Sequence, residues 1–253
     1  MDDLGSLSAS LSTRVFGRSH EHHASLGSTN DRAAQWLREG GPHGLVVTAD
    51  AQSAGRGRNG RVWSSPSGGN LYVSVGLRVR SARRDLSALG LVVGLGLYEG
   101  LGSIEGLGLK WPNDVLVGER KLAGVLCESR WADDVEIVVG FGLNVRRDGI
   151  DAAVVERAIA LDELGITTPR VAVLAGLLES LERRLDAFLM LGFDDHRQAY
   201  LDANVQIGRR VRVVSGDEVF EGVATDIDDG GALRVQTDDG MRSVHAGDVT
   251  RVR

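Results

Sequence analysis

Residues 107 to 145 constrain the fold more than any other part of this sequence. Short apolar stretches alternate there with two tight turns, Pro112-Asn113-Asp114 and Gly118-Glu119-Arg120. Connections this short join strands that run in opposite directions. The pattern therefore predicts the centre of a mixed, largely antiparallel sheet. Its consecutive strands are expected at 107–111, 115–117, 121–129 and 135–145.

Helices and further strands flank this centre and give an α+β fold class. Apolar stretches at 44–49 and 70–77 predict two more strands. Helices are predicted from capping residues and apolar spacing at 28–39, 85–101 and 170–191. The stripe that the longest helix should bury consists of Leu174, Leu177, Leu178, Leu181, Leu185 and Phe188.

The chain changes character near Gln206, where short strands separated by Asp-Gly turns begin. These strands are expected at 211–214, 219–224, 232–236 and 242–245. We interpret 206–253 as a small β-barrel that packs on a main domain at 14–205. Residues 1–13 are small and polar, and we expect them to form a disordered tail.

The glycine-rich stretch GRGRNGRVW, residues 55–63, matches the spacing G-x-G-x-x-G of a dinucleotide-binding turn. The context excludes that motif, because no strand directly precedes it, turn residues follow it, and no acidic residue occurs between Gly60 and Asp85. A phosphate-binding P-loop is excluded as well, since Arg61-Val62 stand where Lys-Ser/Thr are required.

What remains is a flexible loop with three arginines, Arg56, Arg58 and Arg61, followed by Trp63. A guanidinium group suits carboxylates and phosphates, and an indole offers a stacking surface. A solvated basic loop is the alternative. The net charge of −6 argues against broad nucleic-acid binding, so a small anionic ligand is the better match.

Two lysines and a glycine-rich strand could contribute to the same site. Strand alternation places Lys121 on one face with Ala123, Val125 and Cys127, where it either reaches solvent or points into a pocket. Lys110 leaves the same two alternatives open. Glycines before Asn144 indicate either a close approach by a ligand or a bulge.

One cysteine, Cys127, excludes an internal disulfide and a multi-cysteine metal site, and it is expected to be a buried structural thiol. His20, His22 and His23 lie in a polar segment that favours a flexible tail over a metal site. The sequence contains neither the apolar core of a signal peptide nor an apolar stretch long enough for a membrane span, which favours the cytoplasm.

Five motifs occur here in the order seen in biotin protein ligases, and from about residue 25 onward the chain resembles that family. The motifs are Ser28-Thr29-Asn30, Gly55 to Trp63, Lys110-Trp111-Pro112-Asn113-Asp114, Lys121 to Leu126, and Gly142-Leu143-Asn144-Val145.

The resemblance implies a class II synthetase-like catalytic domain with an SH3-like C-terminal barrel. It also implies a two-step reaction in which biotin and ATP give biotinyl-5′-AMP, and biotin then passes to a lysine of a biotin carboxyl carrier domain. Magnesium would be carried mainly by the ATP phosphates.

The resemblance also assigns roles. Lys121, Arg58 and Asp114 would be catalytic: Lys121 and Arg58 bridge the biotin carboxylate and the α-phosphate, and Asp114 helps to hold the incoming lysine. The biotin-binding residues would be Ser28, Thr29, Asn30, Gln52, Arg56, Gly57, Arg58 and Lys121. The ATP-binding residues would be Arg58, Arg61, Trp63, Lys110, Asn113 and Asn144.

The sequence departs from the family pattern in two places. Only about 25 mostly polar residues precede Ser28, too few for the helix-turn-helix domain of the repressor type, so we expect no repression of transcription. Residues 146–151 lack the expected proline-rich pattern, and we assign no ligand contacts to them. The barrel is expected to dock the carrier domain. A lipoate or octanoate ligase, and a non-enzymatic nucleic-acid-binding module, are the alternative functions.

Overall fold

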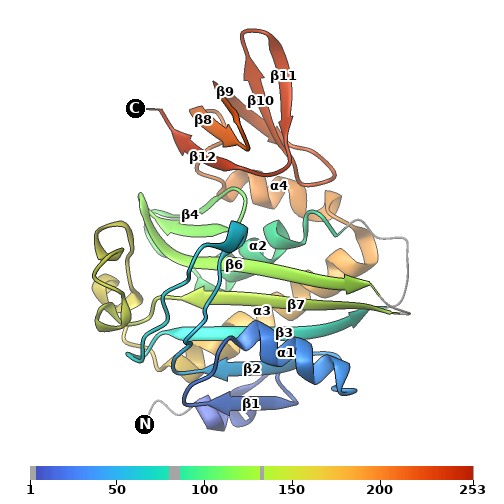
Figure 1. Ribbon diagram of the computed structural model, residues 1–253, viewed down its shortest axis with the longest axis vertical. Helices are drawn as coiled ribbons and strands as arrows, with labels where there is room; N and C mark the ends of the chain where they lie inside the picture. Colours follow the sequence, from blue (N-terminus) through green and yellow to red (C-terminus); the bar gives the residue numbers. More distant parts are fainter. Residues whose placement is uncertain (1–3, 80–85, 132–133, 253) are drawn as a thin grey trace.

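The computed structural model describes residues 4–79, 86–131 and 134–252, which form two β-sheets with helices on the larger one (Figure 1). The larger sheet has seven strands in the order β1-β2-β3-β7-β6-β5-β4. Only β1 and β2 pair in parallel, and all other neighbours are antiparallel, so the predicted α+β class and largely antiparallel sheet are confirmed. The strands are β1 (His20–His23), β2 (Leu45–Ala49), β3 (Leu71–Val79), β4 (Leu107–Lys110), β5 (Asp114–Val117), β6 (Arg120–Trp131) and β7 (Val135–Leu143).

The two faces of this sheet carry separate hydrophobic clusters. Helix α1 (Thr29–Arg38) covers one face through Ala33 and Leu37, which pack on residues of β2 and β7. Helices α2 (Leu89–Leu101) and α3 (Arg170–Leu191) lie on the other face (Figure 1). The site described below lies on the α1 face.

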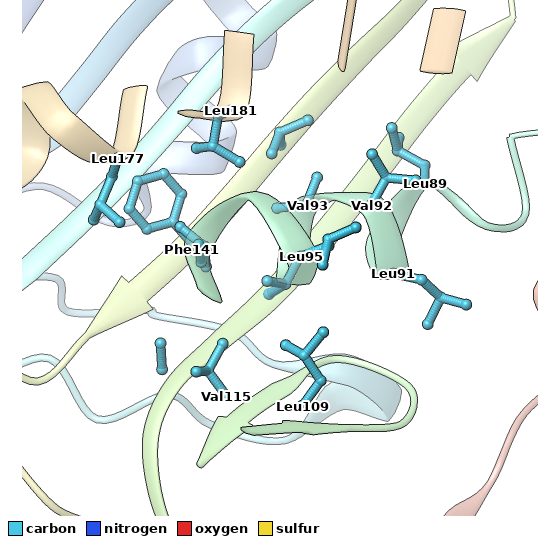
Figure 2. Close-up of a cluster of buried hydrophobic side chains, with 14 of the residues drawn as sticks. Leu89, Leu91, Val92, Val93, Leu95, Leu109, Val115, Phe141, Leu177 and Leu181 are labelled. Carbon is cyan, nitrogen blue, oxygen red and sulfur yellow. The ribbon is translucent and has the colours of Figure 1, made fainter. Parts of the chain in front are cut away.

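Helix α2 lies between the sheet and α3 and is buried on nearly all sides (Figure 2). Its glycines allow α3 to approach closely, since a Cβ at Gly96 would lie 2.9 Å from Leu181 Cδ2. The predicted apolar stripe of α3 is buried as expected. The predicted start of α2 at Asp85 lies outside the described residues.

The C-terminal part forms a five-stranded antiparallel sheet in the order β11-β10-β9-β8-β12. Its closure into a barrel stays a prediction. Helix α4 (Asp194–Ala203), which the sequence analysis missed, leads into it. The strands are β8 (Arg210–Ser215), β9 (Glu218–Ile227), β10 (Leu233–Thr237), β11 (Gly240–Val244) and β12 (Asp248–Arg251). We call residues 206–252 the C-terminal module.

Trp111 and Gln206 connect the C-terminal module to the larger sheet. The Trp111 indole N–H donates to the Gly231 carbonyl at 2.9 Å, and the Trp111 backbone N–H donates to Gln206 Oε1 at 2.8 Å. Gln206 in turn donates to the Val249 carbonyl at 3.2 Å. These buried hydrogen bonds fix the module next to the turn between β4 and β5.

The N-terminal segment corrects two expectations. Residues 1–13 were expected to be a disordered tail, but Leu4–Ser10 form a 3-10 helix that buries Leu4 and Leu7 in the main core. The histidines are not flexible either, because 20–23 form strand β1 along β2. The leucines of this segment are spaced among serines without a helical or strand period, so the sequence did not indicate structure here. Leu4 and Leu7 are ordered because they pack against distant parts of the chain.

Among the described residues, no helix is both long enough and apolar enough to cross a membrane.

The N-terminal edge of the sheet should lose stability when His20 is protonated. His20 Nε2 and His22 Nδ1 both lie within hydrogen-bond distance of Thr48 Oγ1, at 2.8 and 3.0 Å. Burial, with repulsion from His22, lowers the pKa of His20 from 6.5 to about 4. A group that stays neutral when folded contributes stability that is present above its unfolded pKa and lost as the pH falls from 6.5 towards 4.

We therefore expect the free energy of unfolding to fall more steeply between pH 7 and pH 5 in the wild type than in His20→Gln, with a difference of at most about 1.4 kcal/mol per pH unit for one proton. Urea titrations at each pH measure this, with the exposed His245→Gln as control. Equal slopes for wild type and His20→Gln would contradict the prediction.

Candidate functional site

A pocket on the α1 face gathers residues from the start of α1, the arginine loop (residues 52–63), the β4–β5 turn, β6, β7 and the start of β12. Of the predicted site residues, only Asn144 is absent from its lining. Those brought together are Ser28, Thr29, Asn30, Gln52, Arg56, Gly57, Arg58, Arg61, Trp63, Lys110, Asn113, Asp114 and Lys121.

One end of the pocket carries a network of uncharged polar groups. Thr29 donates its backbone N–H to Gln52 Oε1 at 2.8 Å. The buried Ser74 hydroxyl, which the sequence analysis missed, lies 2.8 Å from Thr29 Oγ1 and 2.6 Å from Asn30 Oδ1. Ser28 occupies the N-cap position of α1 but makes no side-chain capping bond. This end therefore presents both donors and acceptors in fixed positions.

The arginine loop folds back on itself as a short hairpin. Gly57 N–H donates to the Arg61 carbonyl at 2.7 Å, and Trp63 N–H donates to the Gly55 carbonyl at 3.0 Å. Asn59 at the tip adopts φ 56°, a left-handed conformation that asparagine tolerates better than most residues. The tip thus reverses the chain within a few residues, and the arginines project in different directions.

The three arginines have different surroundings. Arg56 pairs with Asp31, and Arg61 pairs with Asp248 of the C-terminal module. Within the described part of the chain, Arg58 makes no side-chain hydrogen bond or ion pair, and burial lowers the pKa of its guanidinium. A half-buried cation without a partner favours binding of an anion at this point.

Lys121 points into the pocket because β6 is irregular at its start. The pairing register between β5 and β6 shifts so that Leu116 faces Lys121 while Val115 faces Ala123. This bulge breaks the alternation that had grouped Lys121 with Ala123, and that expectation is wrong. The ammonium group lies 2.6 Å from Asp114 Oδ1 and 5.0 Å from the centre of the Trp63 ring.

Glycines of β6 and β7 leave room for the pocket side chains. Gly124 and Gly142 face each other across the two strands, and the Trp63 indole covers both. A Cβ at Gly142 would lie 2.4 Å from Trp63 Cε2, and a Cβ at Gly140 would lie 2.1 Å from Asn30 Oδ1. The Trp63 indole nitrogen is buried and has no hydrogen-bond partner among the described residues.

The remaining predicted residues divide between lining and support. Lys110 lines the pocket and makes no ion pair in the described part of the protein. Asn113 lines it too, but its amide donates to the Val125 carbonyl at 2.9 Å. Asn144 is buried outside the lining, and its amide donates to the Lys121 carbonyl at 3.2 Å. Asn144 therefore supports the strand that carries Lys121.

The C-terminal module forms part of the pocket wall through Gly247, Asp248 and Val249. The sequence analysis assigned no site residue to this module. Asp248 accepts from Arg61, and that bond lowers the pKa of the Asp248 carboxyl. No local pattern marks such a residue, because its role arises from a contact between positions 187 residues apart.

Residues 145–151 do not line the pocket, although they follow Asn144 directly. The buried Asn70 holds this segment: its Oδ1 accepts from the N–H groups of Val145 and Arg146 at 2.8 and 2.9 Å, and its amide donates to the Gly149 carbonyl at 2.6 Å. Ser64 donates to Asp151 at 2.8 Å, which joins the segment to the end of the arginine loop.

Cys127 packs against the main core but is half-buried and not fully buried as expected, and desolvation raises the pKa of its thiol to about 12. Within the described residues, no group of three or more His, Cys, Asp and Glu side chains is placed to hold a metal ion. The two pocket carboxylates, Asp114 and Asp248, are each paired with a cation of the pocket.

Comparison with known proteins identifies the family. Residues 23–144 match the model of the biotin/lipoate A/B protein ligase family, and residues 206–251 match that of the biotin protein ligase C-terminal domain. The chain is 35% identical to the biotin–[acetyl-CoA-carboxylase] ligase of Mycobacterium tuberculosis, over 91% of this chain and 88% of that protein. The chain belongs to the biotin protein ligase family.

Two further relatives agree with this assignment. The bifunctional ligase/repressor BirA of Bacillus subtilis is 30% identical, over 94% of this chain and 76% of its own length. The structure of the biotin protein ligase from Aquifex aeolicus in complex with biotin and ATP superposes with a TM-score of 0.80 at 28% identity, covering 93% of this chain and all of the other.

The chain is thus an enzyme, a biotin ligase. The alternatives of a lipoate ligase and of a non-enzymatic nucleic-acid-binding module are not favoured, because both parts of the chain match biotin ligase sequences or structures.

Gly142→Ala should displace the Trp63 indole, because the added Cβ cannot lie 2.4 Å from a ring carbon. We expect a change in tryptophan fluorescence that is absent when the same substitution is made in a Trp63→Phe background. Crowding of this kind destabilises by about 1–3 kcal/mol. Gly90→Ala is the control, since a Cβ there meets no atom within 4 Å. Identical spectra for Gly142→Ala and wild type would show that the indole does not rest on Gly142.

Proposed function

We propose that this ligase uses the pocket to activate biotin with ATP and then to transfer biotin to a carrier protein. In the first step a biotin carboxylate oxygen attacks the α-phosphorus of ATP, the bond to the β-phosphate oxygen breaks, and pyrophosphate leaves. In the second step a carrier lysine attacks the acyl carbon of biotinyl-5′-AMP, the amine loses a proton, and AMP leaves. The observation that carries the proposal is the half-buried Arg58, which has no partner among the described residues and lines one pocket with Lys121 and Lys110.

The first step brings two anions together, so cations must lie between them. We assign to Lys121 and Arg58 the bridging of the carboxylate and the α-phosphate, and to Arg61 a contact nearer the pyrophosphate; their common position in the pocket lining supports these roles. Asn144 acts on Lys121 through the Lys121 carbonyl. We expect magnesium to enter with the nucleotide, since its ligands are then phosphate oxygens and water.

The uncharged network suits the ureido ring of biotin, which carries N–H donors and a carbonyl acceptor. Ser28, Thr29, Asn30 and Gln52 present the complementary groups. At the nucleotide end, Trp63 offers a stacking surface for adenine, and Lys110 and Asn113 lie beside it.

For the second step we assign to Asp114 the role of holding the carrier lysine. Its Oδ1 is buried and holds the Lys121 ammonium group at 2.6 Å. A second ammonium group could share the other oxygen, because a carboxylate accepts from several donors.

We propose a biotin carboxyl carrier domain of an acyl-CoA carboxylase as the protein substrate, because the Mycobacterium tuberculosis and Paracoccus denitrificans relatives are named for acetyl-CoA carboxylase. The use of ATP favours a cytoplasmic location. The C-terminal module is placed to meet the carrier, since it forms one wall of the pocket.

Exchange of labelled pyrophosphate into ATP, run with biotin and separately with lipoate, tests the proposal. We expect exchange that depends on biotin. Exchange in the presence of lipoate but not of biotin would identify the enzyme as a lipoate ligase. The absence of exchange with both acids would contradict adenylate formation.

Lys121→Ala should damage adenylate formation far more than ATP binding, because the contribution of a bridging cation grows as charges converge in the transition state. A charge-assisted contact contributes about 1.5–3 kcal/mol, so we expect kcat for exchange to fall tenfold or more. Arg120→Ala is the control, since Arg120 pairs with Glu163 and does not line the pocket. Normal exchange by Lys121→Ala would mean that Lys121 is a solvated lysine without a bridging role.

A further inference from the structure

Arg56, the first arginine of the loop, is bound to carboxylates on the protein. Its guanidinium makes a bidentate contact with Asp31 of α1, with both N–O distances at 2.7 Å, and Glu128 Oε1 of β6 lies 3.5 Å away. The bond from Arg56 lowers the pKa of Asp31. This fork-to-carboxylate geometry fixes the orientation of both partners.

The carboxylates of Asp31 and Glu128 lie outside the pocket lining, although Arg56 belongs to it. Direct contact with a ligand in the pocket is therefore made by residues that they hold. Arg56 is a pocket residue that both Asp31 and Glu128 contact.

Glu128 also contacts the end of the pocket that carries the uncharged network. Its Oε2 accepts from the Asn30 amide at 2.6 Å, while Oε1 faces Arg56. Asn30 and Asp31 are neighbours in the first turn of α1. Glu128 and the first turn of α1 thus connect Asn30, which is proposed to contact biotin, with Arg56 of the arginine loop.

Other attachments join the two ends of the loop to each other and its far side to the C-terminal module. Gln52 donates its backbone N–H to the Ser65 carbonyl at 3.0 Å and its side-chain amide to Ser65 Oγ at 2.9 Å. Arg61 pairs with Asp248. The hairpin holds the backbone on both sides of Arg56, since Gly57 bonds to Arg61 and Gly55 to Trp63. The Arg56 side chain adds a contact from this hairpin to α1 and β6.

We propose that Asp31 and Glu128 are positioning residues that fasten the arginine loop to α1 and to β6, and that Arg56 acts by holding the loop rather than by contacting biotin. The inference rests on the proposed function, because the loop must keep biotinyl-AMP from water until the carrier arrives. Loosening the loop should speed release of the intermediate and leave biotin recognition unchanged, since weakened contacts appear mainly in the off-rate.

The expected change in the release rate follows from the solvent exposure of the Arg56–Asp31 ion pair. The side chains of Arg56 and Asp31 are 37% and 61% exposed, and an exposed ion pair contributes up to about 1 kcal/mol. We therefore expect a change in release rate of about two- to fivefold.

The experiment forms biotinyl-AMP on the enzyme from biotin and labelled ATP, removes free ligand rapidly, and follows release of the labelled intermediate. The variants are Asp31→Asn, Glu128→Gln, Arg56→Gln and the double variant Asp31→Asn/Arg56→Gln. Glu39→Gln is the matched control, because Glu39 is an exposed carboxylate at the end of the same helix that pairs with Arg32. The KM for biotin is measured in parallel by pyrophosphate exchange.

We expect Asp31→Asn to raise the release rate constant about two- to fivefold with less than a twofold change in KM for biotin. Glu128→Gln should act in the same direction but less, since its contact with Arg56 is longer. In the Arg56→Gln background Asp31→Asn should have no further effect, because the partner through which Asp31 acts is already gone. Glu39→Gln should match the wild type.

Additive effects of Asp31→Asn and Arg56→Gln would overturn the proposal, because Asp31 would then act on release without Arg56. A higher KM for biotin with unchanged release would overturn it as well. If Asp31→Asn fails to fold, Glu128→Gln decides, and release at the wild-type rate refutes the proposal. A wild type that forms no biotinyl-AMP would refute the proposed function itself, whereas equal release from an active wild type and its variants refutes only this inference.

Discussion

Mutual repulsion among cations is the constraint around which this site is organised. Arg56, Arg58, Arg61, Lys110 and Lys121 all line one pocket. Placing like charges close together in a partly desolvated space is unfavourable unless opposite charges accompany them. The protein supplies carboxylates from three separate places: Asp31 on α1, Asp114 at the start of β5, and Asp248 on β12. Arg58 has no such partner among the described residues, and it is the natural point for an incoming anion.

The sheet supplies the room that this charge arrangement needs. A strand with ordinary side chains at 124, 140 and 142 would occupy the space now filled by Trp63 and Asn30. Glycine at these positions weakens a strand, and the long pairing of β7 with both β3 and β6 offsets that loss. The middle of the sheet therefore forms one side of the pocket, and the arginine loop forms another.

Local sequence patterns predicted the elements that depend on local physics. The apolar stripe of α3 and the turns between β4, β5 and β6 lie where the sequence placed them, since periodicity and turn residues determine both. The resemblance of the ordered motifs to the family predicted thirteen residues of the pocket lining, but not the wall that Gly247, Asp248 and Val249 form. The predicted features need no knowledge of distant contacts.

What the sequence could not predict depends on contacts between distant segments. The bulge at Lys121 is set by pairing with β5, so strand alternation gave the wrong neighbours. Leu4 and Leu7 become ordered only because the core accepts them. Asp248 and Glu128 carry no motif of their own. Their importance appears when the fold brings each of them to an arginine of the loop.

The placement of the lysines has a chemical consequence for the protein's own surface. The chain contains two lysines, Lys110 and Lys121, and both line the pocket, while every other permanent cationic side chain is an arginine. An acyl adenylate reacts with amines and not with guanidinium groups, which stay protonated at any ordinary pH. Biotinyl-AMP that leaves the pocket therefore meets no lysine side chain on the outside of the enzyme that made it. For the same reason, an amine-directed reagent would modify lysine side chains only in the pocket.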